Sequence, residues 1–65
     1  MVELARIDSD ILRVIESYNE QYRSPSLEEI GTHVGLAKSN VHEHLEILKA
    51  HGFIDIKSGI NIRDI

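Results

Sequence analysis

The chain has 65 residues, of which 42% are apolar and 28% charged, and a formal net charge of −4. A chain this short buries only about 60% of the surface that its unfolded form exposes, which indicates one small domain and argues against a deep enzyme cleft. The sequence contains no cysteine, which excludes disulfides and thiolate metal sites. No segment approaches the roughly 18 consecutive apolar residues of a membrane span, and no signal pattern follows Met1. We therefore expect a cytoplasmic protein with no membrane association.

The charge is unevenly distributed along the chain. Residues 1–32 hold seven carboxylates against three arginines, whereas residues 33–65 hold four of each sign and all four histidines. Contacts with nucleic-acid phosphates require cations, so only the second half has a suitable balance.

A first helix is predicted over residues 8–22, with Asp8 as its N-cap. Its apolar stripe recurs at helical spacing and consists of Ile7, Ile11, Leu12, Ile15, Tyr18 and Tyr22. Pro25 then disfavours helical geometry at Ser24 and ends the pattern.

Two further helices follow. Ser26 and Glu29 form a capping box at the start of a helix over residues 27–34, which Gly35 ends. The third helix is predicted over residues 38–51 and is followed by Gly52 in left-handed geometry. Because alanine is a poor N-cap, Ser39 is an alternative to Ala37 in that role. The expected buried positions are Leu27, Ile30 and Val34, then Val41, Leu45 and Leu48. His44 is expected to pack beside Leu45 and Leu48, and His51 to interact with the last carbonyls of its helix.

Residues 53–65 alternate apolar and polar side chains around Ser58-Gly59-Ile60, which predicts a β-hairpin. The whole chain, residues 1–65, is then a single mainly α (α+β) domain with three helices and a short C-terminal hairpin. Gly31 and Gly35 supply the close contact and the turn of a helix-turn-helix, and Val41 fixes the following helix on the core. The expected fold is a winged helix-turn-helix in which the hairpin is the wing. A three-helix bundle without a ligand would use the same core residues.

The exposed face of the helix 38–51 carries side chains that suit the major groove of DNA. Asn40 can bond bidentately to adenine, and Glu43 can accept from cytosine N4. The remaining candidates for base or phosphate contacts on this helix are Lys38, Ser39 and His42. A merely solvated helix face is the alternative.

Other candidate DNA contacts flank this helix. Lys57, Asn61 and Arg63 lie around the wing, where winged domains touch the DNA backbone or minor groove. Arg23 and Ser26 lie near the first amides of the helix 27–34, which suit a phosphate. The alternatives are a solvated wing and simple helix capping.

The sequence predicts no metal site, no cofactor and no enzymatic activity. His42 and His44 point to different faces of a helix, and the pair His42 and Glu46 has no obvious third ligand. A nucleophile with its base and a phosphate-binding glycine loop are both missing from the sequence.

The segment SPSLEEIGTHVGLAKSNVHEHLEILKAHGFIDI resembles the DNA-binding domain of the LexA repressors. The positions that carry the resemblance are Pro25, Ser26, Glu29, Ile30, Gly35, Leu36, His44, Leu45, Gly52 and Ile54. The resemblance extends into the first helix and implies a sequence-specific repressor with its third helix in the major groove.

The chain departs from that family in two respects. Its turn before the third helix is one residue shorter, as in MarR-like and ArsR-like winged domains, so the family's target sequence does not carry over. The 65 residues contain neither the protease domain nor the Ala-Gly cleavage site of the LexA repressors, so we expect no self-cleavage of this chain.

We expect a transcriptional regulator that binds double-stranded DNA as a homodimer, either as a stand-alone protein or as a domain of a longer one. The first helix or the last strand is the expected dimer surface. An acidic protein-interaction module that binds another regulator or a polymerase is the alternative, because the net charge is −4 and Glu43 and Glu46 lie on the exposed helix face.

Overall fold

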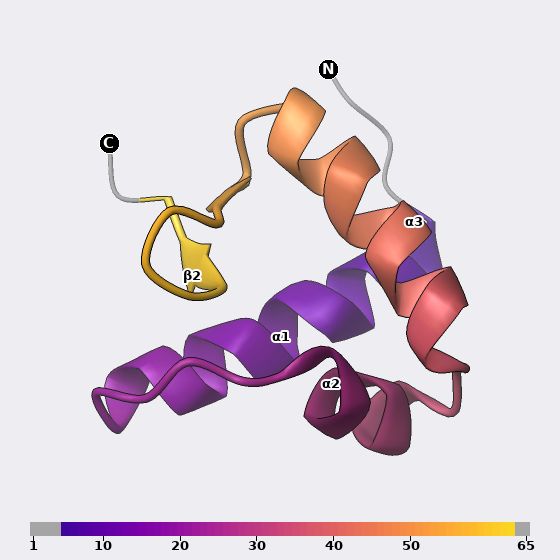
Figure 1. The fold of residues 1–65 in the computed structure, drawn as a ribbon, viewed down its shortest axis with the longest axis horizontal. Coiled ribbons are helices and arrows are strands. Elements are labelled where there is room, and N and C mark those ends of the chain that lie inside the picture. The colour runs from indigo at the N-terminus through magenta and orange to yellow at the C-terminus, as the bar shows by residue number, and fades with distance from the viewer. Residues whose placement is uncertain (1–4, 64–65) are drawn as a thin grey trace.

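The computed structural model describes residues 5–63, which form three helices and a two-stranded hairpin (Figure 1). The elements in chain order are α1 (Arg6–Glu20), α2 (Leu27–Val34), α3 (Lys38–Ala50), β1 (Ile54–Asp55) and β2 (Asn61–Ile62). Helix α1 lies between α2 and the hairpin, α3 packs on α2, and β2 is the strand that contacts α1. This arrangement confirms the predicted mainly α, winged helix-turn-helix fold. The last two residues of the predicted wing, 64 and 65, lie outside the described range.

The core draws apolar side chains from every helix and from the hairpin. Its buried members are Ile11, Ile15, Ile30, Val41, Leu45, Leu48, Ile54 and Ile60. Burying an aliphatic side chain of this size stabilises a fold by about 1.5–3 kcal/mol relative to leaving it exposed. The predicted inward face of α3 is therefore confirmed, and the hairpin is attached to the core through Ile54 and Ile60.

The predicted start of the first helix is wrong, because α1 begins at Arg6 with Ala5 as its N-cap. Asp8 lies inside the first turn and does not cap the helix. Its carboxylate Oδ1 instead lies 2.7 Å from Nδ1 of His44 on α3. His44 thus makes a contact between α3 and α1 that was not predicted from the sequence. Its packing beside Leu45 and Leu48 stays a prediction.

The predicted end of the first helix is also wrong. Helix α1 ends at Glu20, and Tyr22 has a left-handed φ of 59° with its side chain fully exposed rather than on the buried stripe. The Arg23 amide donates to the Tyr18 carbonyl and the Tyr22 amide to the Asn19 carbonyl, at 2.9 Å each. These two bonds form a Schellman motif, in which the left-handed position is usually glycine.

Helix α2 has the predicted bounds and the predicted capping box. Ser26 Oγ accepts from the Glu29 amide at 3.1 Å, and the Ser26 amide donates to Glu29 Oε1 at 2.9 Å. Gly35 ends the helix with φ 75°. A Cβ atom on Gly31 would lie 2.5 Å from the Leu36 carbonyl oxygen and 3.4 Å from Val41. The turn between α2 and α3 therefore depends on the missing side chain of Gly31.

Helix α3 begins at Lys38 after an extended Ala37 that makes no side-chain cap, so Ser39 does not take over the N-cap. The helix ends at Ala50, one residue earlier than predicted. Gly52 is left-handed as expected, with φ 80°, and the Phe53 amide donates to the Leu48 carbonyl at 3.0 Å. The His51 ring lies beside Phe53, with 6.4 Å between ring centroids.

The hairpin is short and antiparallel. Ile54 pairs with Ile62 and Asp55 with Asn61, and the Arg63 amide donates to the Phe53 carbonyl at 3.1 Å. Isolated two-stranded hairpins are marginal in water, so the position of the wing depends on its contacts with the helices.

We predict that Gly31→Ala lowers the free energy of unfolding by about 1–3 kcal/mol, because the new Cβ overlaps a backbone atom that cannot move freely. Urea denaturation measures this change. Gly35→Ala is the matched control: its Cβ would meet no atom within 4 Å, so only the strained φ costs stability. A Gly31→Ala protein as stable as the unmodified chain would contradict the packing argument.

We predict that Tyr22→Gly raises the free energy of unfolding by about 1 kcal/mol, because glycine relieves the left-handed strain and no buried area is lost. Tyr22→Ala removes the same exposed side chain but keeps the strain, so its thermal midpoint should stay close to that of the unmodified chain. A similar gain in both variants would show that the side chain, and not the backbone angle, causes the effect.

Candidate nucleic-acid interface

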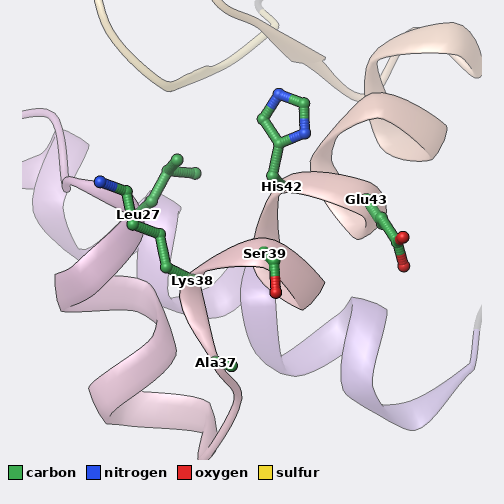
Figure 2. Close-up of a pocket in the computed structure, with 6 residues that line it drawn as sticks. All are labelled: Leu27, Ala37, Lys38, Ser39, His42 and Glu43. Carbon is green, nitrogen blue, oxygen red and sulfur yellow. The ribbon is translucent and has the colours of Figure 1, made fainter.

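The five candidate residues on α3 occupy its first two turns and are all exposed. Four of them, Lys38, Ser39, His42 and Glu43, line one open hollow of about 770 Å³ together with Leu27 and Ala37. Figure 2 shows the Lys38 side chain extending towards Leu27 of α2, while His42 and Glu43 leave α3 in different directions. The hollow therefore joins the starts of α2 and α3 on one surface.

Asn40 is also exposed on the first turn of α3, and within residues 5–63 its side-chain amide makes no hydrogen bond to the protein. An unpaired carboxamide offers two donors and an acceptor at its tip. The Ser39 hydroxyl likewise makes no hydrogen bond to the protein within residues 5–63. These two side chains are available for an external partner without first breaking an internal bond.

Carboxylates lie close to two of the candidate residues on this surface. Lys38 Nζ lies 3.9 Å from Glu28 Oε1, and His42 Nε2 lies 3.7 Å from Glu46 Oε1. Each of these side chains is more than half exposed, and exposed ion pairs contribute less than about 1 kcal/mol. Lys38 and His42 can therefore exchange these carboxylates for a phosphate at little cost.

The wing and the end of α3 form a second basic surface. Lys57 and Arg63 line a hollow of about 260 Å³ that they share with Lys49, Asp55 and Ile54. Lys49 is not among the candidate residues predicted from the sequence. Lys49 lies eleven residues after Lys38 and seven after His42. These spacings place all three on one side of α3, and this was the signal in the sequence that could have identified Lys49.

The structure places Asn61 differently from the other wing candidates. Its Oδ1 accepts from Asn19 Nδ2 at 3.0 Å and from Ser24 Oγ at 2.8 Å. Its side chain therefore already has partners within the protein, at the junction between the wing and the α1–α2 connection. Asn19, on the last turn of α1, is a member of this junction that was not predicted from the sequence, because its partners on the wing are more than 40 residues away in the chain.

Arg23 and Ser26 lie at the start of α2, as expected, and both are engaged there. The Arg23 guanidinium lies 5.5 Å from the centre of the Tyr18 ring, and its Nη2 lies 4.0 Å from Glu29 Oε2. The hydrogen bond from the Ser26 amide lowers the pKa of Glu29, so this carboxylate stays ionised. Partial burial, followed by the hydrogen bond to Glu29, raises the pKa of Tyr18. The cation of Arg23 thus lies beside the side chains of Tyr18 and Glu29.

Within 5–63 no three side chains of the metal-binding types gather closely enough to hold an ion. None of α1, α2 and α3 is long and apolar enough to cross a membrane.

Comparison with known proteins gives one match. The model of the family described as "LexA DNA binding domain" matches residues 1–61. No curated protein and no solved structure matches the chain. The family match covers nearly all of the sequence and agrees with the three helices, the glycine turn and the wing described above. The chain therefore belongs to the family of LexA DNA-binding domains.

Proposed function

We propose that this chain is a sequence-specific transcriptional regulator, a repressor, that places α3 in the major groove of double-stranded DNA. The observation that carries the proposal is the amide of Asn40 on the exposed first turn of α3, which makes no hydrogen bond among residues 5–63. Cations line two hollows on the same helix, Lys38 in one and Lys49, Lys57 and Arg63 in the other. Base edges are read by such amides, while phosphates are held by cations around them.

The proposed contacts fall into two groups. Ser39, Asn40, His42 and Glu43 face the bases, with Glu43 as an acceptor for cytosine N4. The backbone contacts come from Lys38, Lys49, Lys57, Arg63 and Arg23 and from the first amides of α2, beside Ser26. Asn61 supports the wing in this assignment, because its side chain is hydrogen-bonded within the protein.

A second candidate function has its own support. The net charge of −4 and the exposed carboxylates of Glu43 and Glu46 favour a module that binds a basic protein partner. The two functions differ in their response to salt. DNA binding weakens steeply as salt rises, because each neutralised phosphate releases counterions.

One α3 contacts only a few base pairs, so we propose that two copies of the chain bind as a homodimer. A two-fold symmetric pair would read half-sites separated by about one helical turn of DNA.

Selection of bound duplexes from a randomised pool, with the untagged protein at moderate salt, tests the proposal. An enriched, two-fold symmetric motif is the expected result. A single enriched half-site would contradict the proposed homodimer but not sequence-specific DNA binding. No enrichment, together with indifference to DNA at low salt, would refute DNA binding and favour the protein-interaction module.

We predict that Asn40→Ala and Lys57→Ala have different effects on DNA binding. Loss of the Asn40 amide should cost about 1–3 kcal/mol on the selected sequence and relax the preference at one base pair. Loss of the Lys57 charge should weaken binding to all sequences alike and reduce the slope of log affinity against log salt by about 0.9. Fluorescence anisotropy with matched and mismatched duplexes over a salt series measures both effects.

Lys57→Arg is the matched control, because it keeps the charge and should preserve the salt slope. An equal loss across all sequences in both alanine variants would contradict the division into base and backbone contacts.

A further inference from the structure

We infer that Asn19 is a positioning residue for DNA binding: it fixes the orientation of the wing, and thereby the position of Lys57, without touching DNA. This inference rests on the proposed function, since it concerns how the same DNA surface is assembled. Three features of the structure support it.

The first feature is the number of bonds that the Asn19 carboxamide makes. Its Nδ2 donates to the Arg23 carbonyl at 2.9 Å and to Asn61 Oδ1 at 3.0 Å. Its Oδ1 accepts from the backbone amide of Ile62 at 2.8 Å. Both ends of the group are thus used, and one side chain connects α1, the α1–α2 connection and β2.

The second feature is the contact between the wing turn and the α1–α2 connection. Ser24 Oγ donates to Asn61 Oδ1 at 2.8 Å, next to the bond from Asn19. A Cβ atom on Gly59 would lie only 2.7 Å from Ser24 Oγ, so the turn of the hairpin lies directly against Ser24. The Asn61 amide Nδ2 points back to the Gly59 carbonyl at 3.4 Å. Asn61 therefore connects Asn19 and Ser24 to the turn of the hairpin through hydrogen bonds.

The third feature is the weakness of the hairpin itself. Each strand has two residues, and the buried side chains of Ile54 and Ile60 attach the hairpin to the core. Apolar packing is not directional, so it opposes detachment of the hairpin more than its rotation on the core. Hydrogen bonds are directional, and those of Asn19 define one orientation.

The orientation of the wing decides where its cation lies. Lys57 is exposed between β1 and the turn, and the only side-chain bond at its backbone within residues 5–63 is the one from its amide to Asp55 Oδ1, 3.2 Å away. No bond outside the hairpin fixes Lys57 in that range, so its distance from a DNA backbone follows the hairpin as a whole. Removing the Asn19 amide should therefore weaken the Lys57 contact although Lys57 is intact.

The test combines Asn19→Ala with Lys57→Ala and measures DNA affinity over a salt series. Asn19→Ala is expected to lower affinity for all sequences alike and to reduce the salt slope by up to about 0.9, the contribution of one phosphate. Lys57→Ala should then cause a much smaller further loss in the Asn19→Ala background than in the unmodified chain. The base preference assigned to Asn40 should not change.

Ser17→Ala is the matched control on α1, because Ser17 is exposed and has no bond to the wing among the described residues. Circular dichroism establishes that each variant is folded under the binding conditions. Should Asn19→Ala fail to fold, Ser24→Ala carries the test, with a smaller effect of the same kind, since it removes one of the two donors to Asn61.

Two results would overturn the inference. An unchanged salt slope in the folded variant, with additive losses from Asn19 and Lys57, would show that Asn19 contributes to stability alone and would leave the proposed function intact. Absence of salt-dependent DNA binding by the unmodified chain would refute the proposed function, and the role of Asn19 with it.

Discussion

The close approach of the α2 backbone to the Leu36 carbonyl at Gly31 is the constraint on which the rest of the structure depends. Any side chain at this position would overlap that carbonyl, so only glycine allows the turn to follow α2 this tightly. The turn brings Val41 against Gly31, and Val41, Leu45 and Leu48 then direct one side of α3 into the core. Because those three positions face inward, Lys38, Asn40 and His42 must lie outside the core. The choice of side chains that α3 exposes therefore depends on the absence of a Cβ atom at Gly31.

A chain with a net charge of −4 can still carry a DNA-binding surface, because its acidic and basic side chains are not evenly distributed over the surface. Some carboxylates are committed to structure: Glu29 completes the capping box of α2, and Asp8 holds His44. Glu28 and Glu46 face Lys38 and His42 across exposed pairs that are weak enough to exchange. Lys49, Lys57 and Arg63, in contrast, share one hollow with a single carboxylate, that of Asp55. The potential that a ligand meets at this hollow differs from the one that the net charge suggests.

Features specified by neighbouring residues could be predicted from the sequence. The Ser26 and Glu29 pair gives the start of α2, and Gly35 and Gly52 give the ends of α2 and α3, because each signal acts within a few residues. The spacing of the apolar residues gave the inward face of α3 and the exposed position of its candidate contacts for the same reason.

Features that depend on distant residues could not be predicted. The contact of Asp8 with His44 on α3, 36 residues later, has no local signal in the sequence. The left-handed turn at Tyr22 has no local signal, since tyrosine does not favour that geometry. Asn19 and Asn61 lie 42 residues apart, and nothing in the sequence around either one indicates the other. Hydrogen bonds between distant side chains become visible only when the fold brings them together.

The bond from Asn19 to the Ile62 amide has a further consequence for association between chains. Successive amides along an extended chain point to opposite edges. The Arg63 amide points inward to the Phe53 carbonyl just before β1, so the Ile62 amide lies on the outer edge of the hairpin. An open strand edge is a template for edge-to-edge aggregation and domain swapping. The carboxamide of Asn19 occupies the place that an incoming strand would take. Pairing of two chains through this edge would first require that bond to break, so a side chain of α1 blocks the outer edge of the hairpin at Ile62.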